Sequence, residues 1–532
     1  MEEKSPRMAF FGPGTAGELR REEFGNKASN LARMAAMGIM VPPGFSLGVS
    51  ICEEYHRHGG RLPADVPVLL GKGIQLLENA TGRKFGDRRR PLLVSVRSGA
   101  PVSMPGLMDT VLNVGLNRQT VQGMIFMSGN PRFSWDSYRR LVRTMGETVF
   151  GQDPRPYRAL LDKAMEKEGV PDETELDSLA LRELAADEEA LFGDIEGRAF
   201  PEDMFEQLGL ATAAVLRSWK GPRAEAFRRM GMLKGVRGTA VTVQTMVFGN
   251  MGPRSGAGVA FTRDPSSGET ALMVDFKFGA QGEDVVSGES SASQVGLKDA
   301  MPDIHLELGR IGRRLEQSFR DMQDIEFTVQ EGRLYILQCR AGKRAPLAAL
   351  RIAVEMVRDG TVTPAEGLAL LEGVDTGAMR LRRVASEENP LARGEPASTG
   401  VASGGIALSA ETAEGRSRKG PVVLVLEAAR PDDLPGLAAS AGILCARGIR
   451  TSHAAVVARQ MGKVCIVNCP GLVIDLQHKK IGLGGCEMAE GDVLTLDGST
   501  GNVYRGTVGV AEERPEELLA AVEEWRKVAQ KG

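Results

Sequence analysis

The order of sequence patterns along this chain constrains its fold most strongly, because successive stretches have different characters. Residues 153–233 are rich in charged, helix-forming residues with the apolar spacing of amphipathic helices. From Gly238 onwards, strand-like runs such as TAVTVQTMVFGN alternate with glycine-rich turns, and a compact alternation of strands and helices begins near residue 391. At 532 residues the chain is also too long for one hydrophobic core. These features predict several domains.

We expect an α/β and α+β multidomain fold in which a large N-terminal part precedes a compact β/α domain. The predicted parts are residues 1–342 with a helical insertion at about 150–233, a helical linker at 343–390, the β/α domain at 391–508 and a C-terminal helix at 509–532. Within the β/α domain, DVLTLDGSTGNVYRG predicts a hairpin, because Asp-Gly and Gly-Asn pairs favour tight turns.

Charge and cysteine content argue against several classes of partner. The net charge is −3 at pH 7 with both signs spread along the sequence, which disfavours recognition of nucleic acid or an anionic membrane through bulk charge. No stretch approaches the roughly 20 apolar residues that span a bilayer, and the N-terminal MEEKSPRMAFFGPG has no secretory pattern. The six cysteines are scattered, as in reduced proteins. We therefore expect a cytoplasmic protein without nucleic-acid or membrane partners.

One of the five histidines lies in a setting that suits chemistry. His453 lies in RGIRTSHAAVVARQMGK. Thr451 or Ser452 can cap a helix there, and Gly462 can end it. His453 would then lie in the first helical turn. The other histidines have polar neighbours and no obvious partner, and we interpret them as solvated: His56, His58, His305 and His478.

The first turn of a helix favours a particular chemistry at His453. Its partial positive charge disfavours the imidazolium form and keeps a nucleophilic nitrogen available at neutral pH. Its unsatisfied N–H groups can also receive phosphate oxygens, and the small Ala454 and Ala455 leave room for a bulky donor. On spacing alone, a helix-capping histidine without chemistry is an equally good interpretation.

The residues around His453 resemble the phosphohistidine domain of pyruvate, phosphate dikinase and its relatives. TSHAAVVAR followed by MGK carries the resemblance, and EPASTGVASGGIAL and EGDVLTLDGSTGNVYRG resemble that domain's opening and closing stretches. The family's usual Gly-Gly-x-Thr-Ser-His has Ile449 here in place of its second glycine, and Arg450 where an apolar residue is common. These departures predict a loop that is stiffer or shaped for a different partner. Thr451 matches a regulatory phosphorylation position in some relatives, although a helix cap is its simpler role.

The segment SVRSGAPVSMPGLMDTVLNVGLN, residues 95–117, resembles the ATP-grasp domain of the same family. Its Met-Pro-Gly version is typical of the phosphate-dependent branch rather than of the pyruvate, water dikinases. The resemblance places Lys27 at the family's nucleotide-phosphate lysine and Arg97 at its polyphosphate arginine. Asn26 and Ala28 stand where the family usually has glycine. Independently, Arg97 ends a strand before a glycine-rich turn, where a cation can neutralise ATP; a surface arginine on a turn is the alternative.

The segment QDIEFTVQEGRLYILQCR supplies candidates for metal binding. Strand alternation puts Asp324, Glu326 and Thr328 on one face of its first strand. Gln338 and Arg340 share one face of its second strand. The two faces coincide only if the loop has an odd number of residues or the hairpin contains a bulge. Such a cluster suits Mg²⁺ bridging phosphates; the alternative is an edge hairpin whose polar residues face water.

The resemblance extends from about Phe24 to about Gly506 and implies a set of site residues. The residues implied to bind the nucleotide are Lys27, Arg97, Gln281, Glu283, Asp324, Glu326, Gln338 and Arg340. Those implied to bind Mg²⁺ are Glu326, Gln338 and Asp324. The implied catalytic residues are His453, Arg97 and Arg340. A second glycine-rich segment, SGAGVAFTRDP, is a further candidate to fold over phosphates.

The reaction implied by the resemblance uses ATP and phosphate as substrates, with Mg²⁺ as cofactor. It leaves AMP, pyrophosphate and phosphohistidine, and the phosphoryl group then passes to pyruvate in a separate β/α barrel domain. That barrel would begin about where this sequence ends, so we expect a separate barrel subunit as partner; a homodimer is also compatible. Three alternatives stay open: a non-pyruvate acceptor, a sequence cut at the domain junction, and a non-catalytic ATP-responsive scaffold.

Overall fold

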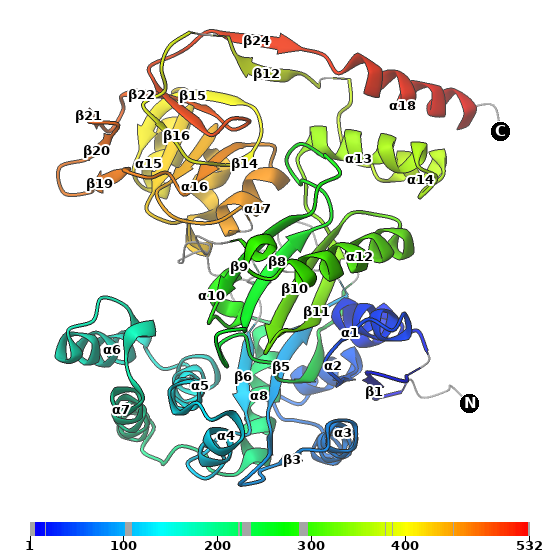
Figure 1. Cartoon of the computed structure of the whole chain (residues 1–532), viewed down its shortest axis with the longest axis vertical. Coiled ribbons are helices and arrows are strands. Elements are labelled where there is room, and N and C mark those ends of the chain that lie inside the picture. The colour runs from blue at the N-terminus through cyan, green and yellow to red at the C-terminus, as the bar shows by residue number, and fades with distance from the viewer. Residues whose placement is uncertain are drawn as a thin grey trace. The chain divides into compact units, whose positions relative to one another are not determined.

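The computed structural model describes residues 6–15, 17–101, 109–221, 224–225, 236–286, 296–377, 379–385, 387–450 and 452–529. The chain divides into two compact units, Met1–Ser255 with Val329–Cys339 and Gly256–Thr328 with Arg340–Gly532 (Figure 1). Both units combine helices with sheets, so the predicted α/β and α+β fold class is confirmed. Among the described helices, none has the length and apolar character needed to cross a membrane.

The first unit is built on a five-stranded sheet in the order β1-β2-β7-β5-β6. Its strands are β1 (Met8–Phe11), β2 (Gly44–Leu47), β5 (Val94–Gly99), β6 (Thr110–Val114) and β7 (Ala240–Thr245). Valines at alternate positions of β5 and β7 are fully buried in one core, which suits a strand buried on that face. Both neighbours of β5 pair antiparallel with it. The end of β5 is therefore fixed on two sides.

Helices surround this sheet, and several begin at side chains that cap them. The described elements are α1 (Arg21–Ala36), α2 (Val49–Arg57), α3 (Val66–Thr81), α4 (Thr120–Ser128), α5 (Pro131–Thr144), the π-helical turn η1 (Met145–Phe150), α6 (Pro154–Glu168), α7 (Ser178–Glu196) and α8 (Met204–Ser218), with the short strands β3 (Lys84–Phe85) and β4 (Pro91–Leu92). Asn130, Asp153, Asp177 and Asp203 each accept a first-turn N–H of α5, α6, α7 and α8.

A charged cluster lies buried between α5 and α7. Arg139 Nη2 donates to Asp136 Oδ1 at 2.8 Å and to Glu173 Oε2 at 3.0 Å. Glu188 is fully buried, 3.8 Å from Arg139 Nη1, and its carboxyl oxygens have no hydrogen-bond partner among the described residues. Burial raises the pKa of Glu188 to about 8, against the opposing effect of Arg139. Because Arg139 is committed to the other two carboxylates, Glu188 is the acid that stays protonated.

We expect the local stability of α5 and α7 to fall as the pH rises towards 8. Glu188 ionises at pH 4.5 when exposed but at about 8 in the fold, so unfolding releases a proton between these values. The free energy of opening then decreases by up to about 1.4 kcal/mol per pH unit. Hydrogen exchange of α5 and α7 amides at about pH 5 and pH 8, corrected for intrinsic rates, measures this decrease. Glu188→Gln should remove most of it; an unchanged pH dependence would contradict the assignment.

The second unit contains a sheet in the order β11-β10-β8-β9, followed by linker helices. Its described elements are β8 (Gly256–Phe261), β9 (Met273–Phe278), α10 (Gly282–Val286), α11 (Leu297–Ala300), α12 (Pro302–Phe319), β10 (Gln323–Gln330), β11 (Arg333–Ala341), α13 (Pro346–Arg358) and α14 (Pro364–Ala369). The division between the two units falls within β10 and β11, so this hairpin supplies residues to both.

The glycines of SGAGVAFTRDP make room for aromatic rings, which corrects the expectation that this segment folds over phosphates. A Cβ atom on Gly256 would lie 2.2 Å from Phe276, and one on Gly258 would lie 2.5 Å from Phe327. All six residues of β8 are buried. The segment is therefore a closely packed internal strand, since only glycine leaves space for the two phenylalanine rings.

A compact β/α domain follows in the second unit, with eight strands in the order β13-β23-β22-β15-β16-β17-β18-β14. Its elements are β13 (Ala392–Arg393), β14 (Glu395–Ser398), β15 (Val401–Ala407), α15 (Ala410–Ser417), β16 (Val422–Leu426), α16 (Leu434–Ala439), β17 (Gly442–Cys445), α17 (His453–Gln460), β18 (Val464–Val467), β22 (Val493–Asp497) and β23 (Asn502–Arg505), with a three-stranded sheet of β19 (Val473–Asp475), β20 (Lys480–Leu483) and β21 (Cys486–Ala489). Strands β15 to β18 pair in parallel, and the predicted hairpin is confirmed as β22 and β23.

The C-terminal helix is shorter than the predicted 509–532. Val510–Glu513 forms strand β24, which pairs antiparallel with β12 (Leu381–Val384), and helix α18 runs over Glu516–Ala529. Pro515 explains the later start, because the residue before a proline avoids helical backbone angles. Trp525 of α18 packs with apolar residues of α13 and α14.

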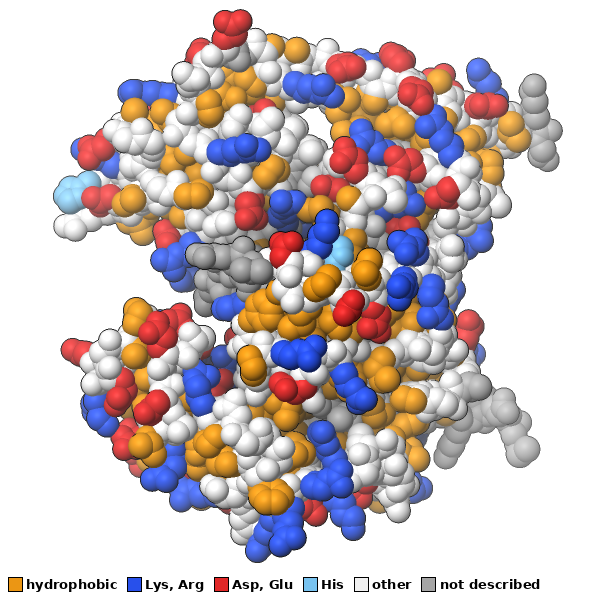
Figure 2. All heavy atoms as spheres, viewed as in Figure 1, with side chains coloured by type: hydrophobic (Ala, Val, Ile, Leu, Met, Phe, Trp, Pro, Cys, Tyr) orange, Lys and Arg blue, Asp and Glu red, His pale blue; other side chains and the backbone are white. Residues whose placement is uncertain are grey.

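On the face drawn in Figure 2, basic and acidic side chains are interspersed.

Candidate active site

Lys27 lies just after a break in helix α1 that depends on glycine. Gly25 has φ 77° and ψ 162°, a conformation that only glycine adopts without strain. A Cβ atom at Gly25 would lie 1.6 Å from the carbonyl oxygen of Gly99, the last residue of β5. The N–H of Asn26 donates to the carbonyl of Ala100 at 3.1 Å. The start of α1, with the half-buried Lys27, is thereby attached to the end of β5.

Arg97 stands on β5, two residues before that contact. It is half-buried and pairs with Thr242 on β7 and Thr110 on β6. Val94 and Val96 on the same strand are fully buried. The first unit therefore holds both predicted phosphate-binding cations, Lys27 and Arg97, on elements that touch through their backbones. The Met-Pro-Gly part of the motif, residues 104–106, lies outside the described residues.

The hairpin of β10 and β11 brings three of the predicted residues together in the second unit. Arg340 Nε donates to Asp324 Oδ2 at 2.8 Å, and Arg340 Nη2 lies 3.8 Å from Glu326 Oε1. Burial raises the pKa of Asp324, and Arg340 opposes this only in part. Burial lowers the pKa of Arg340, but the charges of Asp324 and Glu326 outweigh it and the net direction is upward. The charge of Arg340 thus offsets part of the cost of burying the Asp324 carboxylate.

The shared face of Asp324 and Arg340 requires an irregularity in β11. Only Glu331 and Gly332 separate the strands, both with positive φ (49° and 75°), and a two-residue loop alone would put Asp324 and Arg340 on opposite faces. The alternation of burial along β11 changes phase where Ile336 and Leu337 are both buried. The N–H of Ile336 donates to the carbonyl of Met40 at 2.9 Å. The change of phase agrees with a bulge, one of the two solutions that the sequence allowed.

The hairpin residues fit Mg²⁺ by their chemistry. Asp324 Oδ1 is buried and has no hydrogen-bond partner among the described residues, and the Glu326 carboxylate lies two residues along the same face. Gln338, two residues before Arg340 on β11, carries an amide oxygen of a kind that such ions accept. Mg²⁺ in phosphate sites commonly uses one or two carboxylates together with substrate phosphates. A cluster of three or more His, Cys, Asp or Glu close enough for a metal is not found among the described residues.

The two predicted residues at α10 are Gln281 and Glu283. Gln281 is buried directly before α10, and its N–H donates to Asp284 Oδ2 at 2.8 Å. The side chain of Glu283, within α10, lies outside the described residues. The backbone contact explains how Gln281 is fixed, and it assigns no ligand to either side chain.

His453 is the first residue of α17, as its sequence setting predicted. Helix α17 connects the parallel strands β17 and β18, so its start lies at the carboxyl end of β17, the edge where open α/β sheets bind ligands. Ser452 is the N-cap residue, but its buried hydroxyl makes no cap bond with the described residues. Gly462, at φ 62°, follows the helix end. The side chain of His453, and all of Thr451, lie outside the described residues.

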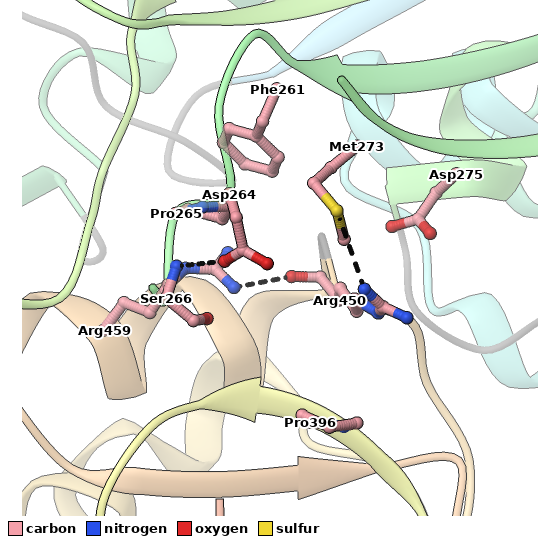
Figure 3. Close-up of a pocket in the computed structure, with 9 residues that line it drawn as sticks. All are labelled: Phe261, Asp264, Pro265, Ser266, Met273, Asp275, Pro396, Arg450 and Arg459. Atoms are coloured by element: carbon pink, nitrogen blue, oxygen red, sulfur yellow. Dashed lines mark hydrogen bonds between the residues drawn. The ribbon is translucent and has the colours of Figure 1, made fainter. Parts of the chain in front are cut away.

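Arg459 is a prominent residue of this region that sequence reasoning missed (Figure 3). It is 1% exposed, and its Nη1 donates at 2.9 Å both to the carbonyl of Ala397 and to that of Arg450. Its guanidinium lies 5.4 Å from the ring centre of Phe261 on β8. The available signal was its spacing: Arg459 follows Ala455 by four residues, which puts it on the buried face of α17.

A small pocket beside Arg459 carries mixed charge (Figure 3). It is lined by Phe261, Asp264, Pro265, Ser266, Met273, Asp275, Pro396, Arg450 and Arg459. Burial lowers the pKa of Arg459 to about 10, and nearby carboxylates that include Asp324 limit this decrease. Arg459 Nε and Nη2 have no hydrogen-bond partner among the described residues. Its charge is thus balanced at a distance by acids of the neighbouring strands.

Comparison with known proteins agrees with the sequence motifs. The family described as "Pyruvate phosphate dikinase, AMP/ATP-binding domain" matches residues 61–304 and 299–360. The family described as "PEP-utilising enzyme, mobile domain" matches residues 419–501, which include α17. Pyruvate, phosphate dikinase 2 of Zea mays is 43% identical over 513 residues, covering 94% of this chain and 58% of that protein. Pyruvate, phosphate dikinase of Clostridium symbiosum is 42% identical over 501 residues, covering 92% of this chain and 57% of that protein. The chain thus spans somewhat more than half the length of these relatives.

Proposed function

The chain belongs to the pyruvate, phosphate dikinase family, and from this premise we propose that it transfers a phosphoryl group from ATP to His453. The observation that carries the proposal is the buried pair of Asp324 and Arg340, in which Asp324 Oδ1 has no hydrogen-bond partner among the described residues. A buried charge pair left with an open oxygen costs stability, and such a cost is typical of a functional site.

In the proposed site, each charged residue has one task. Lys27 and Arg97 neutralise the phosphates of ATP, and Arg340 offers a guanidinium fork to the same charge. Mg²⁺, when bound by Asp324, Glu326 and Gln338, would supply further neutralisation of the triphosphate. By the family resemblance, Gln281 and Glu283 are proposed to contact the nucleotide as well. Arg340 keeps its orientation because Asp324 holds it from one side at 2.8 Å.

The proposed reaction proceeds in two steps that balance. An imidazole nitrogen of His453 forms a bond to the β-phosphorus of ATP, the bond from that phosphorus to the bridging oxygen of the α-phosphate breaks, and AMP leaves. Inorganic phosphate then takes the γ-phosphoryl group, so pyrophosphate leaves and a single phosphoryl group stays on His453. The helix start keeps the imidazole neutral before the first step and stabilises its phosphate afterwards.

The final acceptor of the phosphoryl group is proposed to be pyruvate on a separate barrel subunit, and the enzyme is proposed to work in the cytoplasm. Family membership supports pyruvate, since the relatives named above are pyruvate, phosphate dikinases. None of the six cysteines forms a disulfide in the described part of the chain, and five of them are buried, which suits a reducing compartment. Adding a candidate barrel subunit with pyruvate and measuring phosphoenolpyruvate tests this acceptor.

ATP labelled at either the β- or the γ-phosphorus tests the proposed function. With phosphate present, label from the β-position should stay on the protein in an acid-labile, base-stable form, whereas label from the γ-position should appear in pyrophosphate. Retention of γ-label alone would contradict the two-step order. Binding of ATP without any labelling would favour a non-catalytic, ATP-responsive scaffold instead.

A further inference from the structure

The loop before His453 makes an apolar contact outside its own domain core. Ile449 is 3% exposed and clusters with Ala257 and Val259 of β8 and with Ala280 and Val285. It does not belong to the two described apolar cores of the β/α domain. Ala257 and Val259 stand on the face of β8 opposite to the glycines that pack against phenylalanine rings. The contact thus joins the histidine loop to β8, within the second unit.

Two arginines strengthen this contact from the histidine side. Arg450 Nη1 approaches the sulfur of Met273 on β9 at 3.7 Å, as Figure 3 shows. Arg459 holds the carbonyl of Arg450 at 2.9 Å while its guanidinium faces Phe261 of β8. Ser266 adds a hydrogen bond from its hydroxyl to the carbonyl of Ala397 at 2.8 Å. The loop before His453 is therefore held by hydrogen bonds to its peptide backbone as well as by the apolar contact of Ile449.

The position of β8 gives this contact a consequence for chemistry. Strand β8 is the neighbour of β10, the strand that carries Asp324 and Glu326. Through Ile449, the loop before α17 thus contacts the strand next to β10. Glycine, the residue usual in the family at the position of Ile449, has no side chain that could fill this apolar site.

We propose that Ile449 is a positioning residue for the phosphorylation of His453: its side chain docks the histidine loop on β8. This inference rests on the proposed function for its catalytic consequence, but not for the docking contact itself. A chain with isoleucine here spends more of its time docked than one with glycine. Docking favours the step that loads the histidine.

Fluorescence energy transfer between two dyes measures docking without reference to catalysis. Leu306→Cys on α12 and Leu476→Cys after β19 offer exposed labelling sites, at 57% and 67% exposure, in a Cys486→Ser background because the other five cysteines are buried. Ile449→Gly should lower the ratio of docked to undocked molecules on the order of tenfold, since it removes a buried branched side chain. Ile449→Val should change it only about threefold. Val473→Ala, which shortens an apolar side chain 65% exposed on β19, is the matched control and should change nothing.

The second readout is the rate of His453 labelling from β-labelled ATP. At saturating ATP, Ile449→Gly should slow labelling while the dissociation constant for ATP stays the same, and Ile449→Val should restore most of the rate. Unchanged energy transfer in Ile449→Gly, or an equal change in Val473→Ala, would overturn the proposal, as would slower labelling that arises only from weaker ATP binding. If the native protein takes no label at all, the proposed function fails, and the energy-transfer result still decides whether Ile449 docks the loop.

Discussion

His453→Asn is expected to reduce label incorporation from β-labelled ATP by at least about 10³-fold, to background, because an amide cannot form the phosphorus–nitrogen bond. The affinity for ATP should stay within about twofold, a small change in binding free energy. The reason is that the candidate nucleotide residues lie on other elements, Lys27 on α1, Arg97 on β5 and Arg340 on β11. Acid-labile label per protein, measured beside equilibrium binding of ATP, checks both parts.

His478→Asn is the matched control for this substitution. His478 is exposed on the loop between β19 and β20, where its Nδ1 lies 2.7 Å from Asp475 Oδ2. The control variant should label at the native rate. Persistent labelling of His453→Asn would assign the phosphoryl group to another residue, whereas loss of ATP binding would show that the substitution acts through the fold.

The sequence predicted which residues share a face on each strand of the β10–β11 hairpin. It did not predict whether loop length or a bulge brings the two faces together. Strand alternation put Asp324 with Glu326 and Gln338 with Arg340, and it demanded either an odd loop or a bulge. The structure has a two-residue loop and a change of burial phase within β11, where the N–H of Ile336 bonds the carbonyl of Met40 far away in the sequence. No local pattern encodes that partner, so the choice between the two solutions belongs to tertiary structure.

The loop before His453 is a second case in which a long-range contact could not be predicted from the sequence. The two departures from the family pattern were visible, and they predicted a stiffer loop or one shaped for a different partner. The structure shows that Ile449 packs on β8 of the same chain, a contact between residues about 190 positions apart in sequence that periodicity does not report. Arg459 was missed because a buried arginine contradicts the usual preference of that residue for the surface.

The candidate site of the first unit depends on a glycine whose role the motif did not reveal. The family resemblance indicated Lys27, and Asn26 and Ala28 stand where the family usually has glycine. The structure shows that the backbone requirement lies one residue earlier, at Gly25, whose φ of 77° and contact with Gly99 set the direction of α1. Lys27 therefore reaches its place only if Gly25 keeps this conformation.

Gly25→Ala is expected to destabilise the first unit by about 3 kcal/mol or more. The conformation itself costs an alanine about 1–3 kcal/mol, and the added methyl group would lie 1.6 Å from the Gly99 carbonyl oxygen, so that α1 must move away from β5. Displacement of α1 carries Lys27 away from the end of β5, and ATP affinity should fall on the order of tenfold or more because one phosphate contact is lost. Urea unfolding and equilibrium binding of ATP, measured on the same variant, test the two effects together.

Gly38→Ala is the matched control for Gly25→Ala, because it separates the cost of the backbone conformation from the cost of the steric clash. Gly38 follows the same helix with a similar φ of 71°, but a Cβ atom there would meet nothing within 4 Å. It should cost only the left-handed conformation, about 1–2 kcal/mol, and leave ATP affinity unchanged. If Gly25→Ala proves no more harmful than Gly38→Ala, the contact with Gly99 does not hold α1 in place. If stability falls but ATP affinity does not, Lys27 is not the phosphate ligand that its motif implies, because the helix that carries it would have moved without consequence for the nucleotide.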